Sequence, residues 1–411
     1  MSALGRELVR RGHAVTVVNI PDIESRAREN GLNFYPIGAR QFPPGSYFRI
    51  REQRGALTGL TALRFTVGLL RQFAEMLCAD APGALRAMRV DCLLIHQHTP
   101  AGPTVADYLG IPYVTICDLP LNREPSIPPV VTSWPYRKSR LARLRNEAGY
   151  RVLDWVSQPI MKVIAEYRRR WNLPQYQDID DSYSKLAQVT QLPRCFDYQR
   201  AHLPECFHYA GPFLDGQRCC TEFPFGQLDG RPLIYASMGT IVNRIPNCFH
   251  TIAEACLDNG CQLLISLGGG SSENISRLPG NPLIVDYAPQ LQLLARTSVF
   301  ITHAGLNSAL ESLASGVPVV GIPAMLDQPA TGERIRYVQA GRIVPIRQLS
   351  TVRIREAIID VMSDDRYRAA AKKIQTEIKT IEGITRAADI IEMVVKTNTP
   401  VLNRYDTQWN E

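Results

Sequence analysis

The sequence predicts an α/β fold with two domains, each a doubly wound parallel sheet covered by helices on both faces. Three observations support this prediction. The chain has 411 residues, which is enough for two domains with hydrophobic cores of their own. Short apolar runs rich in β-branched residues alternate with segments of helical periodicity, as is typical of parallel βαβ units. The alternation starts again at residue 233, after a segment rich in Gly, Pro and polar residues.

The first half of the chain carries the first series of elements. Helices are predicted at 2–11, 60–77, 84–88, 101–109 and about 151–171, and strands at 14–20, 31–35, 91–95 and 113–117. Residues 120–150 are rich in Pro and Arg, so we expect an irregular excursion there. We assign 1–210 to an N-terminal domain and 211–230 to the linker that follows it.

The second half carries a second series. Strands are predicted at 233–240, 261–266, 283–285, 298–302 and 319–322, and the C-terminal helices lie between about 352 and 395. We assign 231–385 to a C-terminal domain and 386–411 to a final helix and tail.

Composition favours a cytoplasmic protein. The hydrophobic share of 45% and the charged share of 21% are ordinary for soluble globular chains. The 10 cysteines include no C-x-x-C pair or His/Cys cluster at zinc-ligand spacing, so free thiols in a reducing compartment are expected. Charged residues interrupt the N-terminus from Arg6 onwards, unlike a signal peptide. No apolar stretch is long enough to cross a bilayer.

The net charge of +7 is unevenly distributed. Arginines crowd residues 137–145 and 168–170, and aromatic residues are interleaved with them across 134–171. A solvated helical face, with the aromatic rings in the core, would produce the same pattern. No nucleic-acid-binding motif accompanies it, so we expect no nucleic-acid partner. The other interpretation is peripheral contact with an anionic membrane at its inner face.

The segment from 286 to 328 is the most informative part of the chain. A β-rich run at 298–302 ends at His303, passes through a turn at Gly305 and becomes helical from Asn307. Such a turn directs free backbone N–H groups and the positive end of the helix dipole at one spot, where phosphates bind readily. Asn307 and Ser308 add side-chain donors there, and His303 can donate one more hydrogen bond.

Further polar residues surround this turn in the sequence. Glu311 follows one helical turn later and can accept from a ribose diol, whereas Tyr287 offers a flat face for a base, with the Gln290 amide nearby. Asp327 and Gln328 follow the strand at 319–322, at the sheet edge where open α/β sheets bind ligands. Taken singly, each of these residues is more often a structural residue than a ligand-binding one, and a lone Asn-Ser is usually a helix cap.

A second strand also runs into a Gly turn. The strand that begins at residue 233 ends in Ser237, Gly239 and Thr240, which are further candidates for phosphate contact. No Asp-x-Asp pair lies near any of these residues, so we expect neither a metal ion nor a prosthetic group. The helix terminus and the polar side chains would then stabilise the negative charge of a diphosphate.

Taken together and in this order, the residues resemble the donor-site signature of family 1 glycosyltransferases. That family uses UDP-sugars and has the GT-B fold, in which two Rossmann-like domains face each other across a cleft and the last helix crosses back to the first domain. The matching residues are Tyr287, Ala288, Pro289, Gln290, Thr302, His303, Gly305, Asn307, Ser308, Glu311, Gly316, Val317, Pro318, Asp327 and Gln328. A second likeness lies at 99–106 and 117–129, which resemble the bacterial zeaxanthin and macrolide glucosyltransferase branch.

The resemblance implies a role for each candidate. His303, Asn307 and Ser308 would hold the diphosphate of UDP-glucose, the expected donor. Asp327 and Gln328 would bind the hydroxyls of the sugar. Tyr287 would stack on uracil, Gln290 would lie near the uridine, and Glu311 would bind the ribose hydroxyls.

The resemblance also exposes a gap at the N-terminus. Family members begin with a strand and a Gly-His loop whose His is the general base, whereas this chain begins inside the helix that follows. We expect that the start codon has been placed too far downstream. In the doubly wound order the absent strand is central, so its absence would leave two strand edges unpaired. His96, at the end of the strand 91–95, could serve as base with Asp118 orienting it, or it could be a polar strand cap or a wall of the acceptor pocket.

We therefore expect an inverting, metal-independent enzyme that moves a hexose, in our view glucose, from a UDP-sugar to a hydroxyl group. The expected acceptor is a lipophilic small molecule such as a carotenoid, terpenoid or polyphenol. Two alternatives remain open. One is a nucleotide-sugar-binding homologue that has lost its base. The other is a different GT-B activity, such as sugar-nucleotide epimerisation or transfer to a membrane lipid carrier.

Overall fold

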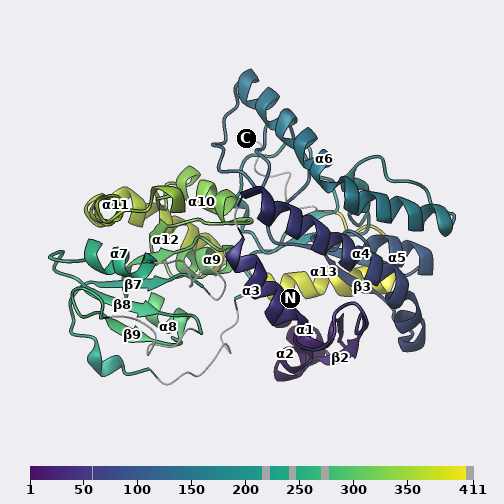
Figure 1. Cartoon of the computed structure of the whole chain (residues 1–411), viewed down its shortest axis with the longest axis horizontal. Helices are drawn as coiled ribbons and strands as arrows, with labels where there is room; N and C mark the ends of the chain where they lie inside the picture. Colours follow the sequence, from purple (N-terminus) through teal and green to yellow (C-terminus); the bar gives the residue numbers. More distant parts are fainter. Residues whose placement is uncertain (58, 215–222, 240–246, 270–276, 404–411) are drawn as a thin grey trace.

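The computed structural model describes residues 1–57, 59–214, 223–239, 247–269 and 277–403. Two α/β halves lie side by side, and the last described helix lies with the half in which the chain began (Figure 1). Each half has parallel strands at its centre and helices around them, as the sequence predicts.

The second half contains a six-stranded sheet in the order β12-β11-β10-β7-β8-β9, and every neighbouring pair in it is parallel. Its strands are β7 (Leu233–Ser237), β8 (Gln262–Ser266), β9 (Leu283–Val285), β10 (Thr297–Thr302), β11 (Val319–Gly321) and β12 (Gly341–Ile343). The chain lays down β7, β8 and β9 in one direction. It then crosses back, so that β10 pairs with the other side of β7 and the order runs the opposite way. The two strands at this reversal point are where such sheets bind ligands.

Helices bury both faces of this sheet. They are α7 (Cys248–Ala255), α8 (Gln290–Leu294), α9 (Leu306–Ala314), α10 (Gln328–Tyr337), α11 (Thr351–Ser363) and α12 (Asp365–Lys379). Val299 and Ile301 of β10 join a core with α7 and α11, whereas Phe300 between them joins a core with α8 on the opposite face. The continuous apolar sequence of β10 thus reflects burial on both faces.

The first half contains two separate sheets. β3 (Leu93–His96), β4 (Tyr113–Cys117), β5 (Gln188–Thr190) and β6 (Phe207–Tyr209) form a parallel four-stranded sheet, and β1 (Thr16–Asn19) and β2 (Asn33–Pro36) form a parallel pair. Among the residues described, β1 pairs only with β2 and β3 only with β4. In the described ranges, β1 and β3 therefore each have one edge without a neighbouring strand, as the family resemblance implies.

The helices of the first half differ in part from the prediction. They are α1 (Ser2–Arg10), α2 (Glu24–Glu29), α3 (Ser46–Ala56), α4 (Gly59–Met88), α5 (Gly102–Leu109) and α6 (Arg140–Arg170). The predicted break between 77 and 84 is wrong, because α4 continues through Pro82. Contacts of α4 with α5 and α6 evidently outweigh the cost of about 3 kcal/mol for an internal proline. The predicted excursion over 120–150 is also wrong in its last third, since α6 begins at Arg140, and α3 was not predicted because its sequence is largely polar.

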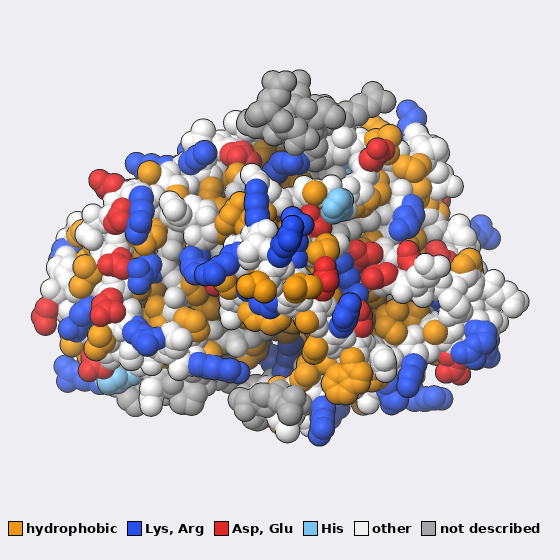
Figure 2. Space-filling view, turned by 90° about the horizontal axis from the view of Figure 1, so that it is seen from above, with side chains coloured by type: hydrophobic (Ala, Val, Ile, Leu, Met, Phe, Trp, Pro, Cys, Tyr) orange, Lys and Arg blue, Asp and Glu red, His pale blue; other side chains and the backbone are white. Residues whose placement is uncertain are grey.

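Short 3₁₀ turns complete the described secondary structure: Pro21–Ile23, Ile179–Ser182, Arg194–Phe196, Phe225–Gln227 and Ile346–Gln348. No helix in the described ranges is both long enough and apolar enough to span a membrane. Figure 2 shows one face of the molecule, on which Lys and Arg side chains lie among exposed hydrophobic ones.

The final helix returns to the first half. α13 (Gly383–Thr397) packs against α1, and its Ile391 and Val394 share a core with Leu4 and Leu8. Arg11 adds ion pairs to Asp389 at 2.6 Å and Glu392 at 2.9 Å. This packing ties the end of the chain to its beginning, as Figure 1 also shows.

Candidate active site

The site is centred on the carboxyl ends of β7 and β10, which lie next to each other because Thr302 pairs with Ser237. His303 follows β10 directly, and Gly239 follows β7. Ala304 adopts a φ of 57°, a left-handed conformation that is uncommon for a residue with a side chain. The turn from β10 into α9 is therefore held in a strained shape, which is frequent at functional sites.

The His303 ring is held in a narrow seat between two glycines. A Cβ on Gly239 would lie 2.6 Å from its Cε1, and a Cβ on Gly305 would lie 2.3 Å from its Nε2. The Thr302 hydroxyl lies 3.2 Å from Nδ1. Burial lowers the pKa of His303 to about 4, and a hydrogen bond with the Ser237 backbone only partly opposes the shift. The imidazole is thus neutral at physiological pH and has one N–H to donate.

The N-terminus of α9 opens toward the same place. Gly305 precedes the helix, and no side chain caps its first turn. The amide of Asn307 is exposed and Ser308 is half-buried in that turn. Free N–H groups, the helix dipole and two polar side chains therefore converge beside His303, an arrangement suited to an anionic group.

Glu311 lies one turn further and is held by Gln290. The Gln290 amide group donates to the Glu311 carboxylate, while its oxygen accepts from the Tyr235 hydroxyl at 3.3 Å. Gln290 therefore positions Glu311 as well as lying near the expected base. The Tyr287 ring is 57% exposed and stands over Gly269, where a Cβ would come within 2.3 Å of its hydroxyl. An exposed, fixed aromatic face is what base stacking needs.

Asp327 and Gln328 lie where α10 begins, after β11. The oxygen of Gln328 accepts the backbone N–H groups of Ala324 at 3.0 Å and Met325 at 3.1 Å. Its NH₂ group is what Gln328 can offer a ligand, because the oxygen holds the preceding loop. Burial raises the pKa of Asp327, and the negative charge of Asp118 raises it further.

His96 and Asp118 lie at the ends of the paired strands β3 and β4 in the first half. His96 Nε2 lies 3.0 Å from a carboxylate oxygen of Asp118. Burial raises the pKa of Asp118, but the hydrogen bond and charge of His96 outweigh it, so the net shift is downward. The backbone N–H of His98 points at His96 Nδ1 from 3.4 Å. These two contacts fit a tautomer of His96 that carries its proton on Nε2, toward Asp118, with the Nδ1 lone pair facing the His98 N–H.

Gln191 connects the His96–Asp118 pair to Asn307 at the start of α9. The sequence did not single out this residue. Its side-chain NH₂ group donates to Asp118 at 3.1 Å and to the side-chain oxygen of Asn307 at 3.1 Å. The residue is 9% exposed and follows β5 directly. A polar residue directly after a buried parallel strand lies at the sheet edge where ligands bind, and this position could have identified Gln191 from the sequence.

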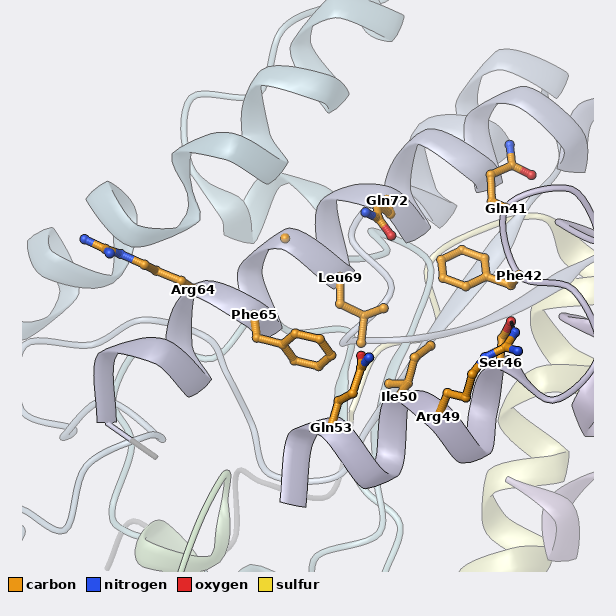
Figure 3. Close-up of a pocket in the computed structure, with 11 residues that line it drawn as sticks. Gln41, Phe42, Ser46, Arg49, Ile50, Gln53, Arg64, Phe65, Leu69 and Gln72 are labelled. Atoms are coloured by element: carbon orange, nitrogen blue, oxygen red, sulfur yellow. Dashed lines mark hydrogen bonds between the residues drawn. The ribbon is translucent and has the colours of Figure 1, made fainter. Parts of the chain in front are cut away.

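A separate cavity of about 400 Å³ lies between α3 and α4. Figure 3 shows Ile50, Phe65 and Leu69 pointing into the space between the two helices, whereas Arg64 points away from it. Phe42 closes one end and stacks on Phe73 at 4.4 Å between ring centroids. The lining also includes the polar residues Gln41, Ser46, Arg49, Gln53, Arg64 and Gln72. None of the lining residues belongs to the polar site at the strand ends.

The structure thus brings together nearly all candidates that the sequence singled out. Thr240 lies outside the described residues. Within the described part of the chain, no three His, Cys, Asp or Glu side chains are placed to hold a metal ion.

Comparisons with known proteins show the family and the fold of the chain. Residues 180–398 match the family model described as UDP-glucoronosyl and UDP-glucosyl transferase. The chain is 32% identical over 406 residues to a zeaxanthin glucosyltransferase of Pantoea ananas, covering 97% of this chain and 94% of the relative. It is 29% identical over 405 residues to the zeaxanthin glucosyltransferase of Pseudescherichia vulneris, covering 96% and 94%. Among solved structures, the glycotransferase of kitacinnamycin superposes with a TM-score of 0.73 at 22% identity, covering 95% of this chain and 94% of that one.

Proposed function

Because the chain belongs to the UDP-glucoronosyl and UDP-glucosyl transferase family, and is thus a GT-B glycosyltransferase, we propose that it transfers glucose from UDP-glucose to a hydroxyl of a lipophilic small molecule, with inversion. The observation that carries the proposal is the link through Gln191. One amide connects the His96–Asp118 pair of the first half to Asn307 beside the expected diphosphate position of the second.

The donor would occupy the ends of β7 and β10. Uracil stacks on Tyr287 and the ribose diol donates to Glu311. The diphosphate accepts from the α9 N-terminus, Asn307, Ser308 and neutral His303, with Ser237 and Gly239 beside it. Asp327 and the Gln328 amide bind the sugar hydroxyls. No metal ion is needed in this scheme, since fixed N–H dipoles stabilise the departing phosphate oxygen.

In the transfer step, the acceptor hydroxyl gives its proton to His96 Nδ1, and its oxygen forms a bond to the anomeric carbon. The bond from that carbon to the phosphate oxygen breaks, and its electron pair leaves with UDP. Asp118 stabilises the imidazolium that forms, through the hydrogen bond at 3.0 Å. Attack from the face opposite UDP inverts the configuration of the sugar.

The acceptor would place its apolar body in the cavity between α3 and α4. Phe42, Ile50, Phe65 and Leu69 would contact the apolar body of a carotenoid, terpenoid or polyphenol, and the polar residues of the same lining would contact its hydroxyl groups. In this proposal residues 1–210 bind the acceptor, 211–230 form the linker, 231–385 bind the donor, and 386–411 return to the first half. We place the enzyme in the cytoplasm, where UDP-sugars are its donors.

One observation favours a second candidate, a nucleotide-sugar-binding protein without turnover. The His98 N–H already points at the lone pair of His96 Nδ1. An acceptor hydroxyl must displace this contact before His96 can act as base. At 3.4 Å the contact is long for a hydrogen bond and therefore weak.

The test is to incubate the purified full chain with UDP-glucose and hydroxylated lipophilic acceptors, and to look for hexosylated product by mass spectrometry. NMR of the product then gives the anomeric configuration. A β-glucoside supports the proposal, and an α-glucoside overturns the inverting mechanism. Binding of UDP-glucose without product, together with an unchanged UDP-glucose affinity in His96→Ala, selects the second candidate. Interconversion of the donor without acceptor would instead indicate an epimerase.

A further inference from the structure

The N-terminal part of α6 exposes large hydrophobic side chains. Leu141 is 79% exposed, Leu144 61%, Val152 58% and Trp155 71%. In Figure 1, α6 projects from the body of the molecule. Scattered exposed hydrophobic residues are common and need no explanation, but four on one helix are unusual.

These residues form a single stripe. With Ala148 they occupy positions 141, 144, 148, 152 and 155, which at 100° per residue fall within an arc of about 80°. An apolar stripe of this spacing normally faces a protein core. The opposite face of α6 does so, since Ala142, Asn146 and Ile160 are buried. The exposed stripe is therefore a second apolar face, and no described part of the chain covers it.

Cations flank the stripe. The side chains of Arg137, Lys138, Arg140, Arg143 and Arg151 are all exposed. In the described part of the chain, none of them forms an ion pair with a carboxylate, and Lys138 bonds only to the Gln199 amide. Two acidic residues, Glu147 and Asp154, lie among these cations, and Asp154 pairs with Arg123. The cations therefore outnumber the carboxylates along the stripe. Figure 2 shows hydrophobic side chains with Lys and Arg around them on the face from which α6 projects.

We propose that this stripe of α6 docks on an anionic lipid surface, with Leu141, Leu144, Val152 and Trp155 in the interface and the flanking cations on the headgroups. An amphipathic helix with Trp and Leu on one side and Arg on the rim lies in the plane of the membrane. Each exposed cation adds electrostatic attraction to acidic headgroups.

Charge favours a lipid surface over a second copy of the chain. A dimer formed through the stripe would bring the same unpaired cations from both copies around one small interface, and like charges repel there. An anionic surface neutralises them instead. Docking would also suit a lipophilic acceptor, because α6 packs along α4, whose Phe65 and Leu69 line the cavity proposed for it.

The test is vesicle flotation of the full chain with phosphatidylcholine alone and with a mixture containing phosphatidylglycerol. We expect binding to the acidic vesicles that weakens with salt, and little binding to the neutral ones. The double variant Leu141→Gln with Leu144→Gln should bind acidic vesicles at least about tenfold more weakly, as should Arg140→Gln with Arg143→Gln.

The matched control is Val352→Gln with Ile359→Gln on α11, where the side chains are 64% and 49% exposed. It should bind vesicles like the parent chain. All variants should keep the melting temperature and the UDP affinity of the parent chain. Weaker vesicle binding then results from the changed side chains and not from unfolding. Equal binding to both vesicle types, or no effect of the α6 variants, overturns the proposal. A dimer by light scattering that only the α6 variants dissolve would assign the stripe to self-association instead.

Discussion

At the scale of single residues, two glycines decide where the ring of His303 can lie. Gly239 and Gly305 leave space on either side of it, and each would intrude on the ring if it carried a Cβ. The ring in turn owes its neutrality to burial, which lowers its pKa. A neutral ring can donate a hydrogen bond to phosphate without first losing its own hydration as a cation.

Gly239→Ala should therefore weaken UDP-glucose binding by at least about tenfold, measured by calorimetry, because the new methyl displaces His303. Its control is Gly260→Ala. Both glycines have a left-handed φ, 67° and 65°, but nothing lies within 4 Å of a Cβ at Gly260. Both variants should lose about 1–2 kcal/mol of stability from backbone strain, and only the first should lose affinity. Equal UDP-glucose affinities in the two variants would show that the position of the His303 ring does not affect donor binding.

Gln191 is a positioning residue in our interpretation, because it contacts Asp118 and Asn307 rather than a reacting atom. Gln191→Met keeps the length of the side chain and removes both hydrogen bonds. We expect about 3–10-fold weaker UDP-glucose binding, from the freed Asn307 amide, and a fall in kcat beyond that, from the freed Asp118. The pH dependence of kcat/KM should also shift, because Asp118 contacts His96.

Gln199→Met is the control for this variant, since Gln199 is exposed and lies outside the site. Direct UDP-glucose binding tests the contact to Asn307 even if no acceptor is found. A variant with unchanged affinity and an unchanged pH profile would reduce Gln191 to a structural residue.

At the scale of elements, α6 shows how local sequence and tertiary contact combine. The helix begins where Ser139 accepts from the backbone N–H of Ala142 at 3.3 Å, an N-cap that the sequence pattern did not reveal. Gly149 lies inside the helix, where glycine is normally unfavourable. Trp134 packs over it, and the Arg145 guanidinium lies 4.9 Å from the Trp134 ring centroid. The glycine therefore serves packing.

Gly149→Ala should destabilise the protein by about 1–3 kcal/mol, because the methyl would overpack the site. It would lie 2.7 Å from the Trp134 ring and 3.0 Å from Pro129. Gly83→Ala in α4 is the matched change, with nothing within 4 Å of the new Cβ. It should stabilise by about 0.5–1 kcal/mol through helix propensity. Chemical denaturation of both variants checks the opposite signs.

At the scale of the whole molecule, a buried charge cluster helps to join the two halves. Asp197 of the first half binds Arg200 at 2.8 Å and Arg334 of α10 at 2.8 Å, and these side chains are almost completely buried. The Tyr209 hydroxyl donates to the same carboxylate at 2.9 Å. Burial raises the pKa of Asp197, but the two guanidinium groups outweigh it and lower the pKa to about 2.

Asp197→Asn should cost about 3–5 kcal/mol, because two buried guanidinium groups lose their counter-charge. The folded pKa lies below that of the unfolded chain. The stabilisation from Asp197 is therefore complete above about pH 4 and is lost as the pH falls toward 2. Thermal unfolding of the variant should depend less on pH in that window than unfolding of the parent.

Asp229→Asn is the control, since it breaks an exposed pair with Arg231 and should leave the melting temperature nearly unchanged. Similar melting temperatures in the two variants would contradict a structural role for the buried cluster.

Much of the fold could be predicted from the sequence, because buried parallel strands are apolar along their whole length. Four of the predicted strands of the second half lie within one residue of their expected limits, including β10 at Thr297–Thr302. The strand predicted at 233–240 ends at Ser237, and β12 was not predicted. The failures have tertiary causes. α4 continues through Pro82 because neighbouring helices support it, and α3 forms from a sequence with little periodicity.

By itself, the sequence determined the parallel α/β architecture, the family of the chain and the order of the donor-site residues, since these follow from periodicity and from spacing along one segment. Only the tertiary structure decided which residues meet across segments. The pairing of β3 with β4 brings His96 to Asp118, and Gln191 reaches Asn307 across 116 positions. The exposure of the α6 stripe was likewise undecided, because an apolar stripe has the same sequence whether it is buried or faces water. Local pattern fixes which face is apolar, and packing of distant segments fixes what that face meets.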